Sequence, residues 1–145
     1  MWNEIVRDIC SVPVLLYLAI RDKKDLEVSH REMWIAIAAL LLAGVFAGTG
    51  WESRLGGAAY GVVVVVFCLF SKEALGLADG VIILVCGIAF GLYETAGVSF
   101  IAMVATALVS AVLLICKKAG RKSRLPFFPF LLFGYVLLRL FAYSV

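Results

Sequence analysis

Few side chains in this sequence can carry acid–base or nucleophilic chemistry. The single histidine is His30, and the four cysteines are scattered without a CxxC pair. These are too few good ligands for a metal site, so none is expected. No Gly-x-Ser-x-Gly turn marks a serine hydrolase, and no glycine-rich loop marks a phosphate-binding site. The carboxylates remain as the candidates for catalysis.

Two aspartates at the edges of apolar segments are the strongest of these candidates. Asp22 follows the apolar residues 12–20, and Asp79 lies within residues 75–80 at the start of another apolar segment. An ionisable residue at such a depth is a functional hypothesis by default. If the two carboxyl groups meet, repulsion and partial burial raise the pKa of one, as in aspartic proteases. We expect a separation of about 3–7 Å, which leaves room for one water molecule.

Each aspartate also has a structural interpretation. Asp79 could cap the N-terminus of a helix, and Asp22 could be an ordinary loop charge. Asp25, one helical turn after Asp22, is the best substitute for it. His30 and the acidic residues nearest to the two aspartates are typical of solvated loops. These acidic residues are Asp25, Glu27, Glu32 and Glu73.

The composition indicates the elements that must position these side chains. Of 145 residues, 64% are hydrophobic and only 16% are charged, whereas a soluble domain is about half apolar. So small a globule cannot bury that excess, so lipid must cover it. We therefore predict one all-α domain, residues 1–145, that is a polytopic membrane bundle of about six helices. The expected segments start near Asn3 or Ile5 and run to residue 20, then span 33–49, 55–70, 75–93, 96–116 and 126–143.

Basic residues predict the orientation of this bundle. Ten fall in one set of loops and two on the opposite side, so the first set is expected to be cytoplasmic and both termini outside. Arg139, near the outer end of the last helix, is expected to snorkel toward water. The opposite side holds Arg7 and Arg54. The cytoplasmic set is Arg21, Lys23, Lys24, Arg31, Lys72, Lys117, Lys118, Arg121, Lys122 and Arg124.

Three short stretches in this order resemble the type IV prepilin peptidases, which are GxGD-class aspartic peptidases. The first places Asp22 on the family's first catalytic Asp, with Val28-Ser29-His30 at its Ile-Pro-Asn position. The second, Gly76-Leu77-Ala78-Asp79, corresponds to the Gly-x-Gly-Asp motif. The third, residues 124–130, is similar to the Pro-Phe-x-Pro-Phe sequence before the last helix. The likeness is greatest to the short forms that process Flp-type pilins and lack a methyltransferase domain.

The resemblance implies catalytic roles for Asp22 and Asp79 and a supporting role for the residues around them. This sequence departs from the family pattern at Ala78, at Ser29 and His30, and at Val81, where a lysine is often found. Ala78 is a small change if its position is helical and a serious one if the position needs positive φ. The supporting residues are Gly76, Ala78, Gly80, Val28, Ser29, His30, Pro126 and Pro129. Pro126 and Pro129 either shape a substrate groove or fix the start of the last helix.

The resemblance further implies an endopeptidase of the bacterial cytoplasmic membrane that needs no cofactor. Its substrate would be a type IV or Flp-like prepilin whose basic leader stays cytoplasmic and whose apolar helix follows the cut. The carboxylates of Asp25, Glu27, Glu32 and Glu73 could attract that leader. The partners expected are prepilins and lipid, with no nucleic acid. Two alternatives stay open: a non-catalytic scaffold of a pilus or secretion system, and a small transporter that uses Asp79 as an ion site.

Overall fold

A computed structural model describes residues 2–25, 29–71, 76–116 and 125–144 of the chain. These residues form six α-helices and no strand. The prediction of an all-α fold is therefore confirmed. The helices are α1 (Trp2–Asp25), α2 (His30–Val45), α3 (Trp51–Phe70), α4 (Leu77–Phe90), α5 (Leu92–Ile115) and α6 (Phe128–Ser144).

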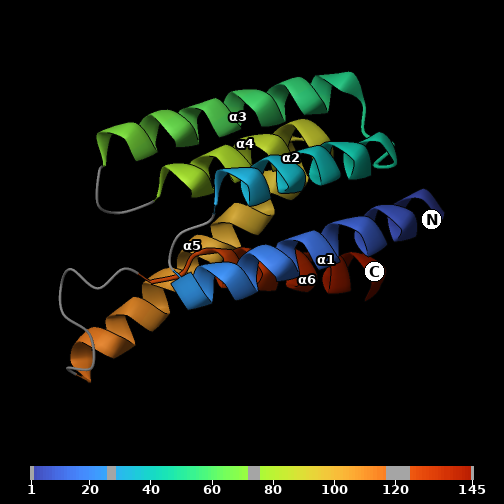
Figure 1. The fold of residues 1–145 in the computed structure, drawn as a ribbon. Coiled ribbons are helices and arrows are strands. Elements are labelled where there is room, and N and C mark those ends of the chain that lie inside the picture. The colour runs from blue at the N-terminus through green and yellow to red at the C-terminus, as the bar shows by residue number, and fades with distance from the viewer. Residues whose placement is uncertain (1, 26–28, 72–75, 117–124, 145) are drawn as a thin grey trace.

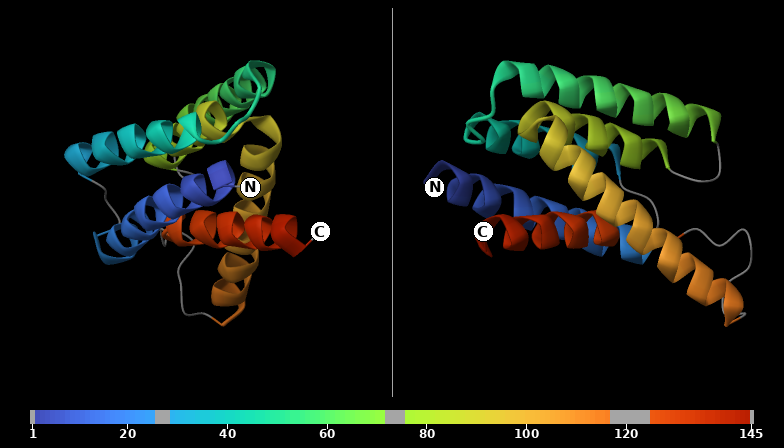
Figure 2. Two further views of the ribbon diagram at one scale, coloured as in Figure 1. Left: turned by 90° about the vertical axis from the view of Figure 1, so that its right-hand side faces the viewer. Right: turned by 180° about the vertical axis from the view of Figure 1, so that it is seen from behind.

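Successive helices run back and forth along the bundle (Figure 1). Helices α2, α3 and α4 form one group, and α1 and α6 lie side by side in another. Helix α5 runs obliquely along one side of the bundle, from the first group to the second (Figure 2). Both chain ends lie at the same end of the bundle, as expected for an even number of helices that alternate in direction. The opposite end holds the end of α1 and the starts of α4 and α6. We call it the Asp22 end.

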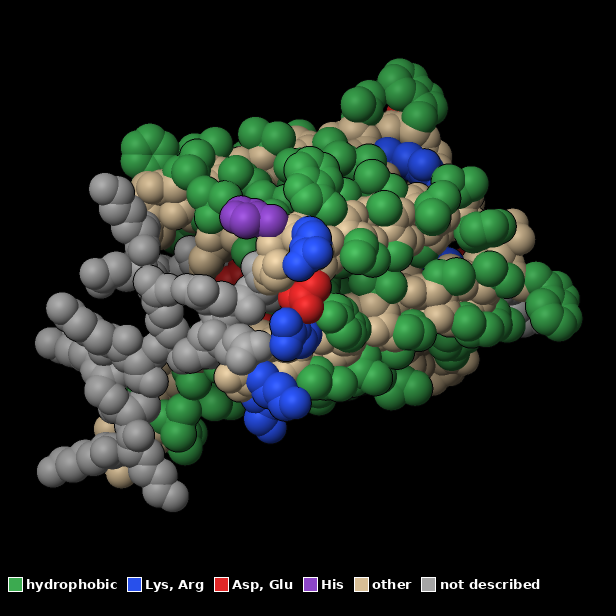
Figure 3. All heavy atoms as spheres, in the orientation of Figure 1, with side chains coloured by type: hydrophobic (Ala, Val, Ile, Leu, Met, Phe, Trp, Pro, Cys, Tyr) green, Lys and Arg blue, Asp and Glu red, His purple; other side chains and the backbone are tan. Residues whose placement is uncertain are grey.

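Two helices, α3 and α5, are long and apolar enough to cross a membrane. Large apolar side chains cover much of the surface drawn in Figure 3, and its charged side chains gather mainly in a band toward the Asp22 end. The exposed apolar side chains come from all six helices and include Phe70, Phe100 and Ile115. Such a surface is unfavourable in water and suits a lipid environment.

Glycines bring α3 and α4 into close contact. A Cβ atom on Gly57 would collide with the backbone of Gly87, and one on Gly61 would collide with Leu84. The two α3 glycines are four residues apart, which places them on one helix face where small side chains let two backbones approach. Because α4 carries Asp79, this contact also helps to position the candidate site.

The break between α4 and α5 differs from the sequence expectation. The expected segments 75–93 and 96–116 put the turn at Glu94 and Thr95, but both residues lie inside α5, and the break falls at Gly91. Gly91 has φ 90°, a left-handed conformation that glycine adopts at little cost. The predicted position of the turn is wrong because Glu94, as described below, belongs to an ion-pair cluster within the bundle.

Candidate active site

Asp22 lies in the last turn of α1 and is only 8% exposed. Its Oδ2 atom accepts a hydrogen bond of 3.1 Å from the backbone N–H of Phe128, the first residue of α6. Burial raises the pKa of the Asp22 carboxyl above its ordinary value, while the backbone N–H groups of Phe128 and Phe127 oppose that rise. Asp22 is therefore held by the N-terminus of another helix rather than being a free loop charge.

The approach to α6 explains how that helix presents N–H groups to Asp22. Pro126 precedes it, and Pro129 is its second residue. Proline is favoured in the first turn of a helix because its fixed φ suits the helix and its missing N–H leaves no donor unpaired. The N–H groups that remain point out of the N-terminus, where the helix dipole favours a negative charge. This geometry agrees with the interpretation in which the two prolines fix the start of the last helix.

Asp79 is the third residue of α4, whose N-cap is Gly76. Its Oδ2 atom accepts a hydrogen bond of 3.1 Å from the N–H of Gly76, which is the reciprocal half of a capping box. The interpretation of Asp79 as the N-cap itself is therefore wrong, since the helix begins two residues earlier. Ala78 is the second helical residue, so the alanine at this motif position needs no positive φ.

The structure brings the two aspartates to the same end of the bundle. They are near enough for the charge of Asp22 to act on the carboxyl group of Asp79. Helix α2 packs against both α1 and α4 and so joins the helices that carry them. Two like charges at this range favour a state in which the pair retains one proton. That state is the one an aspartic dyad needs.

Gly80 brings the first turn of α4 against α3. A Cβ atom at this position would lie 3.0 Å from Sγ of Cys68 and 3.4 Å from Cα of Val65. Gly80 follows Asp79 directly, so this contact fixes the depth at which the aspartate lies. Cys68 is thus part of the wall beneath the candidate site.

Glu32 joins the last turns of α1 to the start of α2. Its carboxylate accepts hydrogen bonds from the Tyr17 hydroxyl at 2.8 Å, from Nε of Arg21 at 3.0 Å and from the N–H of Ser29 at 3.2 Å. The bonds from Tyr17 and Arg21 hold the pKa of Glu32 below its ordinary value. Ser29 is the N-cap of α2, and His30 begins that helix with an exposed side chain.

The remaining residues predicted to support the site or bind substrate are only partly described. Asp25 is the last residue of α1, and its backbone is helical. Glu27, Val28 and Glu73 lie outside the described residues. Within the described part of the chain, no group of three or more His, Cys, Asp or Glu side chains could hold a metal ion.

A second group of charges lies at the other end of the bundle, and we call it the Asp8 cluster. It comprises Arg7, Asp8, Glu94, Tyr135, Arg139 and Tyr143. Arg139 is only 7% exposed, and its Nε atom lies 2.8 Å from Oδ2 of Asp8. The expectation that Arg139 snorkels to water is therefore wrong, because a carboxylate on α1 holds it inside the bundle. Arg7 is 1% exposed and pairs with Glu94 at 3.1 Å.

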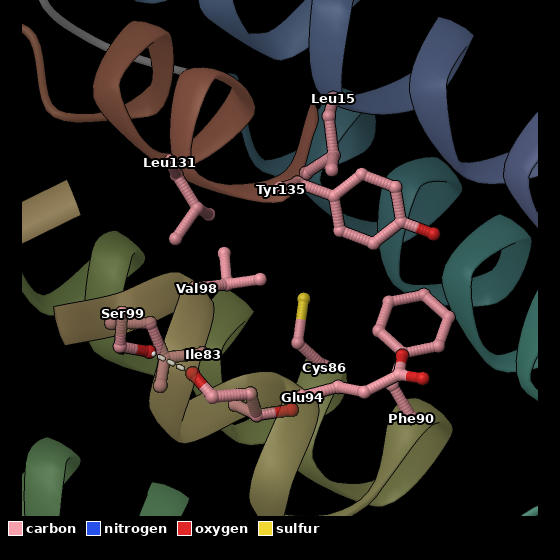
Figure 4. A pocket seen from close by; sticks show the side chains of 10 residues that line it. Leu15, Ile83, Cys86, Phe90, Glu94, Val98, Ser99, Leu131 and Tyr135 are labelled. Carbon is pink, nitrogen blue, oxygen red and sulfur yellow. Dashed lines mark hydrogen bonds between the residues drawn. The ribbon is translucent and has the colours of Figure 1, made fainter. Parts of the chain in front are cut away.

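A small pocket lies among α1, α4, α5 and α6 (Figure 4). Leu15 and Tyr135 face Cys86 and Phe90 across it, and Glu94 lies at its edge in this view. Neither Asp22 nor Asp79 lines this pocket. The hollow therefore belongs to the interior beside the Asp8 cluster rather than to the aspartate pair.

Two features of the structure were not predicted from the sequence. The Phe127 and Phe128 N–H groups that reach Asp22 are backbone atoms, so no side-chain pattern names them. The prolines on either side of them were a usable signal, because they predict a helix start with exposed donors. The Asp8 cluster had a signal too, since Arg7, Asp8 and Arg139 are charges within segments expected to span the membrane.

One of three comparisons with known proteins found a match. The model of the type IV leader peptidase family matches residues 9–111, a range that contains both Asp22 and Asp79. The comparisons with curated proteins and with solved structures gave no match. The family match covers 103 of the 145 residues, counting both ends of its range. Because this match covers more than half of an all-helical chain that carries both aspartates at one end, the chain belongs to the type IV leader peptidase family.

Proposed function

We propose that this protein is a membrane-embedded aspartic endopeptidase that removes the basic leader from type IV or Flp-like prepilins. Asp22 and Asp79 are its catalytic pair. The observation that carries the proposal is their arrangement: two carboxyl groups from distant parts of the sequence, near enough to interact, in a chain of the leader peptidase family. In this proposal all six helices span the bacterial cytoplasmic membrane, and the Asp22 end faces the cytoplasm.

The surroundings of the two carboxyl groups suggest a division of roles. Two backbone N–H groups at the N-terminus of α6 favour the charged form of Asp22. In the proposed mechanism Asp22 is therefore the ionised member, and Asp79 holds the shared proton. Asp22 takes a proton from a water molecule, which attacks the scissile carbonyl carbon. Asp79 donates a hydrogen bond to the carbonyl oxygen and then assists the departure of the leaving amine.

In this proposal the basic leader binds acidic side chains. Asp25, Glu27, Glu32 and Glu73 are the proposed contacts. Glu32 already pairs with Arg21 at 3.0 Å, so it has less free charge to offer a leader than an unpaired carboxylate would. Charge reversal at the other three should weaken leader binding, measured as a rise in KM. Unchanged KM values in all three variants would remove this part of the proposal.

Leader cleavage in cells tests the catalytic pair. A candidate prepilin is co-expressed with the wild type or with Asp22→Asn or Asp79→Asn, which keep the side-chain size but remove the titratable group. Glu52→Gln, in the first turn of α3, is a matched control because it removes an exposed carboxylate at the opposite end. We expect cleavage by the wild type and the control and by neither aspartate variant, at equal membrane levels.

Other outcomes of this experiment would contradict the proposal in different ways. Cleavage that survives in Asp22→Asn would exclude Asp22 from the pair and direct attention to Asp25. If the wild type cleaves none of several prepilins, a non-catalytic scaffold becomes the better interpretation.

A further inference from the structure

Helices α1 and α6 pack side by side in opposite directions (Figure 1). At the Asp22 end they are joined by the bond from the Phe128 N–H to Asp22. At the far end they are joined by the Asp8 cluster. The helix that supplies donors to the candidate catalytic carboxylate is thus fastened to the same neighbour at both of its ends.

The far-end contact is built on one carboxylate. Asp8 accepts hydrogen bonds from the Tyr135 hydroxyl at 2.7 Å, from Nε of Arg139 at 2.8 Å and from the Tyr143 hydroxyl at 2.8 Å. All three donors belong to α6, and they lie on one face of it because they are four residues apart. Charge-assisted hydrogen bonds of this length are strong and directional. They therefore define both the position of α6 along α1 and its rotation.

Other helices hold this cluster in place. Arg7 lies beside Asp8 on α1 and pairs with Glu94 on α5, and its guanidinium lies 5.6 Å from the centre of the Phe90 ring on α4. Arg139 also reaches Glu94, at 3.5 Å. The cluster therefore joins α6 to α5 as well as to α1, and Arg7 connects it to α4.

We propose that Asp8 is a positioning residue for the active site: it fixes α6 along α1 and so keeps the Phe128 N–H on the Asp22 carboxylate. This inference rests on the proposed function of Asp22. A stiff helix transmits an axial shift along its length. A shift of about 1 Å would stretch the 3.1 Å bond beyond hydrogen-bonding distance. Asp22 would then lose a donor that favours its charged form.

The pH dependence of cleavage reports this loss. Asp79 on α4 is near enough to interact with Asp22, Arg21 and Lys23 flank it on α1, and His30 and Glu32 lie in the first turn of α2, which packs against α1. A substitution at Asp8 alters none of them directly. Asp22 that loses its α6 donors ionises at higher pH, so the acidic limb of the rate profile should move to higher pH. A variant that merely folds less well would lower the amount of active protein without moving that limb.

The experiment uses the full-length protein in lipid nanodiscs, with a synthetic peptide that carries a prepilin leader and the start of its apolar helix. Asp8→Asn keeps the shape of the side chain but removes its charge. Glu4→Gln is the matched control, because Glu4 contacts Arg139 at 3.3 Å from a half-exposed position one turn earlier on α1. Two readouts are taken: the pH profile of kcat, and amide hydrogen exchange at Phe127 and Phe128 by NMR.

For Asp8→Asn we expect kcat to fall about tenfold, as for a small misplacement of a catalytic group, with its acidic limb at higher pH. We also expect faster exchange at Phe127 and Phe128. Glu4→Gln should match the wild type, and Asp8→Glu should recover part of the loss. If exchange at Phe128 and the pH profile both stay unchanged, Asp8 is only a local anchor and the inference is wrong. If the wild type cleaves no leader, the proposed function fails, while the exchange data still decide whether Asp8 positions α6.

Discussion

The contact between Gly80 and Cys68 allows a direct test of how the depth of Asp79 is set. In Gly80→Ala the new Cβ atom would lie 3.0 Å from Sγ of Cys68, which is tighter than an ordinary van der Waals contact by several tenths of an ångström. The sulfur or the first turn of α4 must therefore move. Overpacking of this kind costs about 1–3 kcal/mol. Replacing glycine inside a helix with alanine returns about 1 kcal/mol.

Because the second term offsets only part of the first, Gly80→Ala should lower the free energy of unfolding by at most about 2 kcal/mol. Cleavage should be more sensitive, since Asp79 is adjacent and a misplacement of about 1 Å can cost a hundredfold in rate. For a shift of several tenths of an ångström we expect a loss of about tenfold in kcat. The assay measures leader cleavage by reconstituted protein at saturating peptide, alongside thermal unfolding of the same samples.

A double-variant cycle identifies the cause of that loss. Cys68→Ala removes the sulfur, so Gly80→Ala combined with Cys68→Ala should recover most of the rate, and Cys68→Ala alone should be nearly wild type. Recovery should be incomplete, because Cα of Val65 also lies 3.4 Å from the new atom. If Gly80→Ala cleaves at the wild-type rate, or if the double variant is no better than the single one, this account of the Asp79 position is refuted.

Three further predictions concern packing, topology and pH. Gly57→Ala should lower the melting temperature by several degrees, because its Cβ would strike the backbone of α4, whereas Gly50→Ala, with nothing within 4 Å, should not. In a background without native cysteines, a membrane-impermeant maleimide should label Thr49→Cys in intact cells and Lys23→Cys only after permeabilisation; the reverse result would invert the topology. The depressed pKa of Glu32 means that its stabilising contribution is present above the unfolded-state pKa and is lost as the pH falls through the folded-state pKa. Glu32→Gln should therefore reduce the loss of thermal stability between neutral and acid pH, and the same loss as in the wild type would contradict this.

The hydrophobic segments predicted much of the fold, because a long apolar segment in lipid must satisfy its backbone hydrogen bonds by forming a helix. They gave an all-helical chain with an even number of segments, and the helices carry the two aspartates to one end. The predicted helix boundaries were less accurate where polar residues form ion pairs inside the bundle. Glu94 was interpreted as part of a turn because isolated acidic residues usually mark loops, yet it pairs with Arg7 inside the bundle.

The candidate pair could be named from the sequence, but its surroundings could not. Asp22 and Asp79 were conspicuous as acidic residues beside apolar segments. Their hydrogen bonds come from backbone N–H groups, which every residue except proline carries. The residue types in the sequence therefore do not predict these bonds. The Asp8–Arg139 pair joins residues 131 positions apart, and a single sequence does not show which distant charges meet.

The central claim is that Asp22 and Asp79 form one site, and cross-linking in the membrane tests it most directly. In a background without native cysteines, Asp22→Cys is combined with Asp79→Cys and treated with a bis-methanethiosulfonate that spans about 5 Å, a length that matches a pair able to share one water. Asp22→Cys combined with Thr49→Cys, at opposite ends of the bundle, is the control. The account predicts rapid internal cross-linking of the first pair and none of the second. A first pair that reacts no faster than the control would show that the two aspartates do not meet, and would contradict the proposed mechanism.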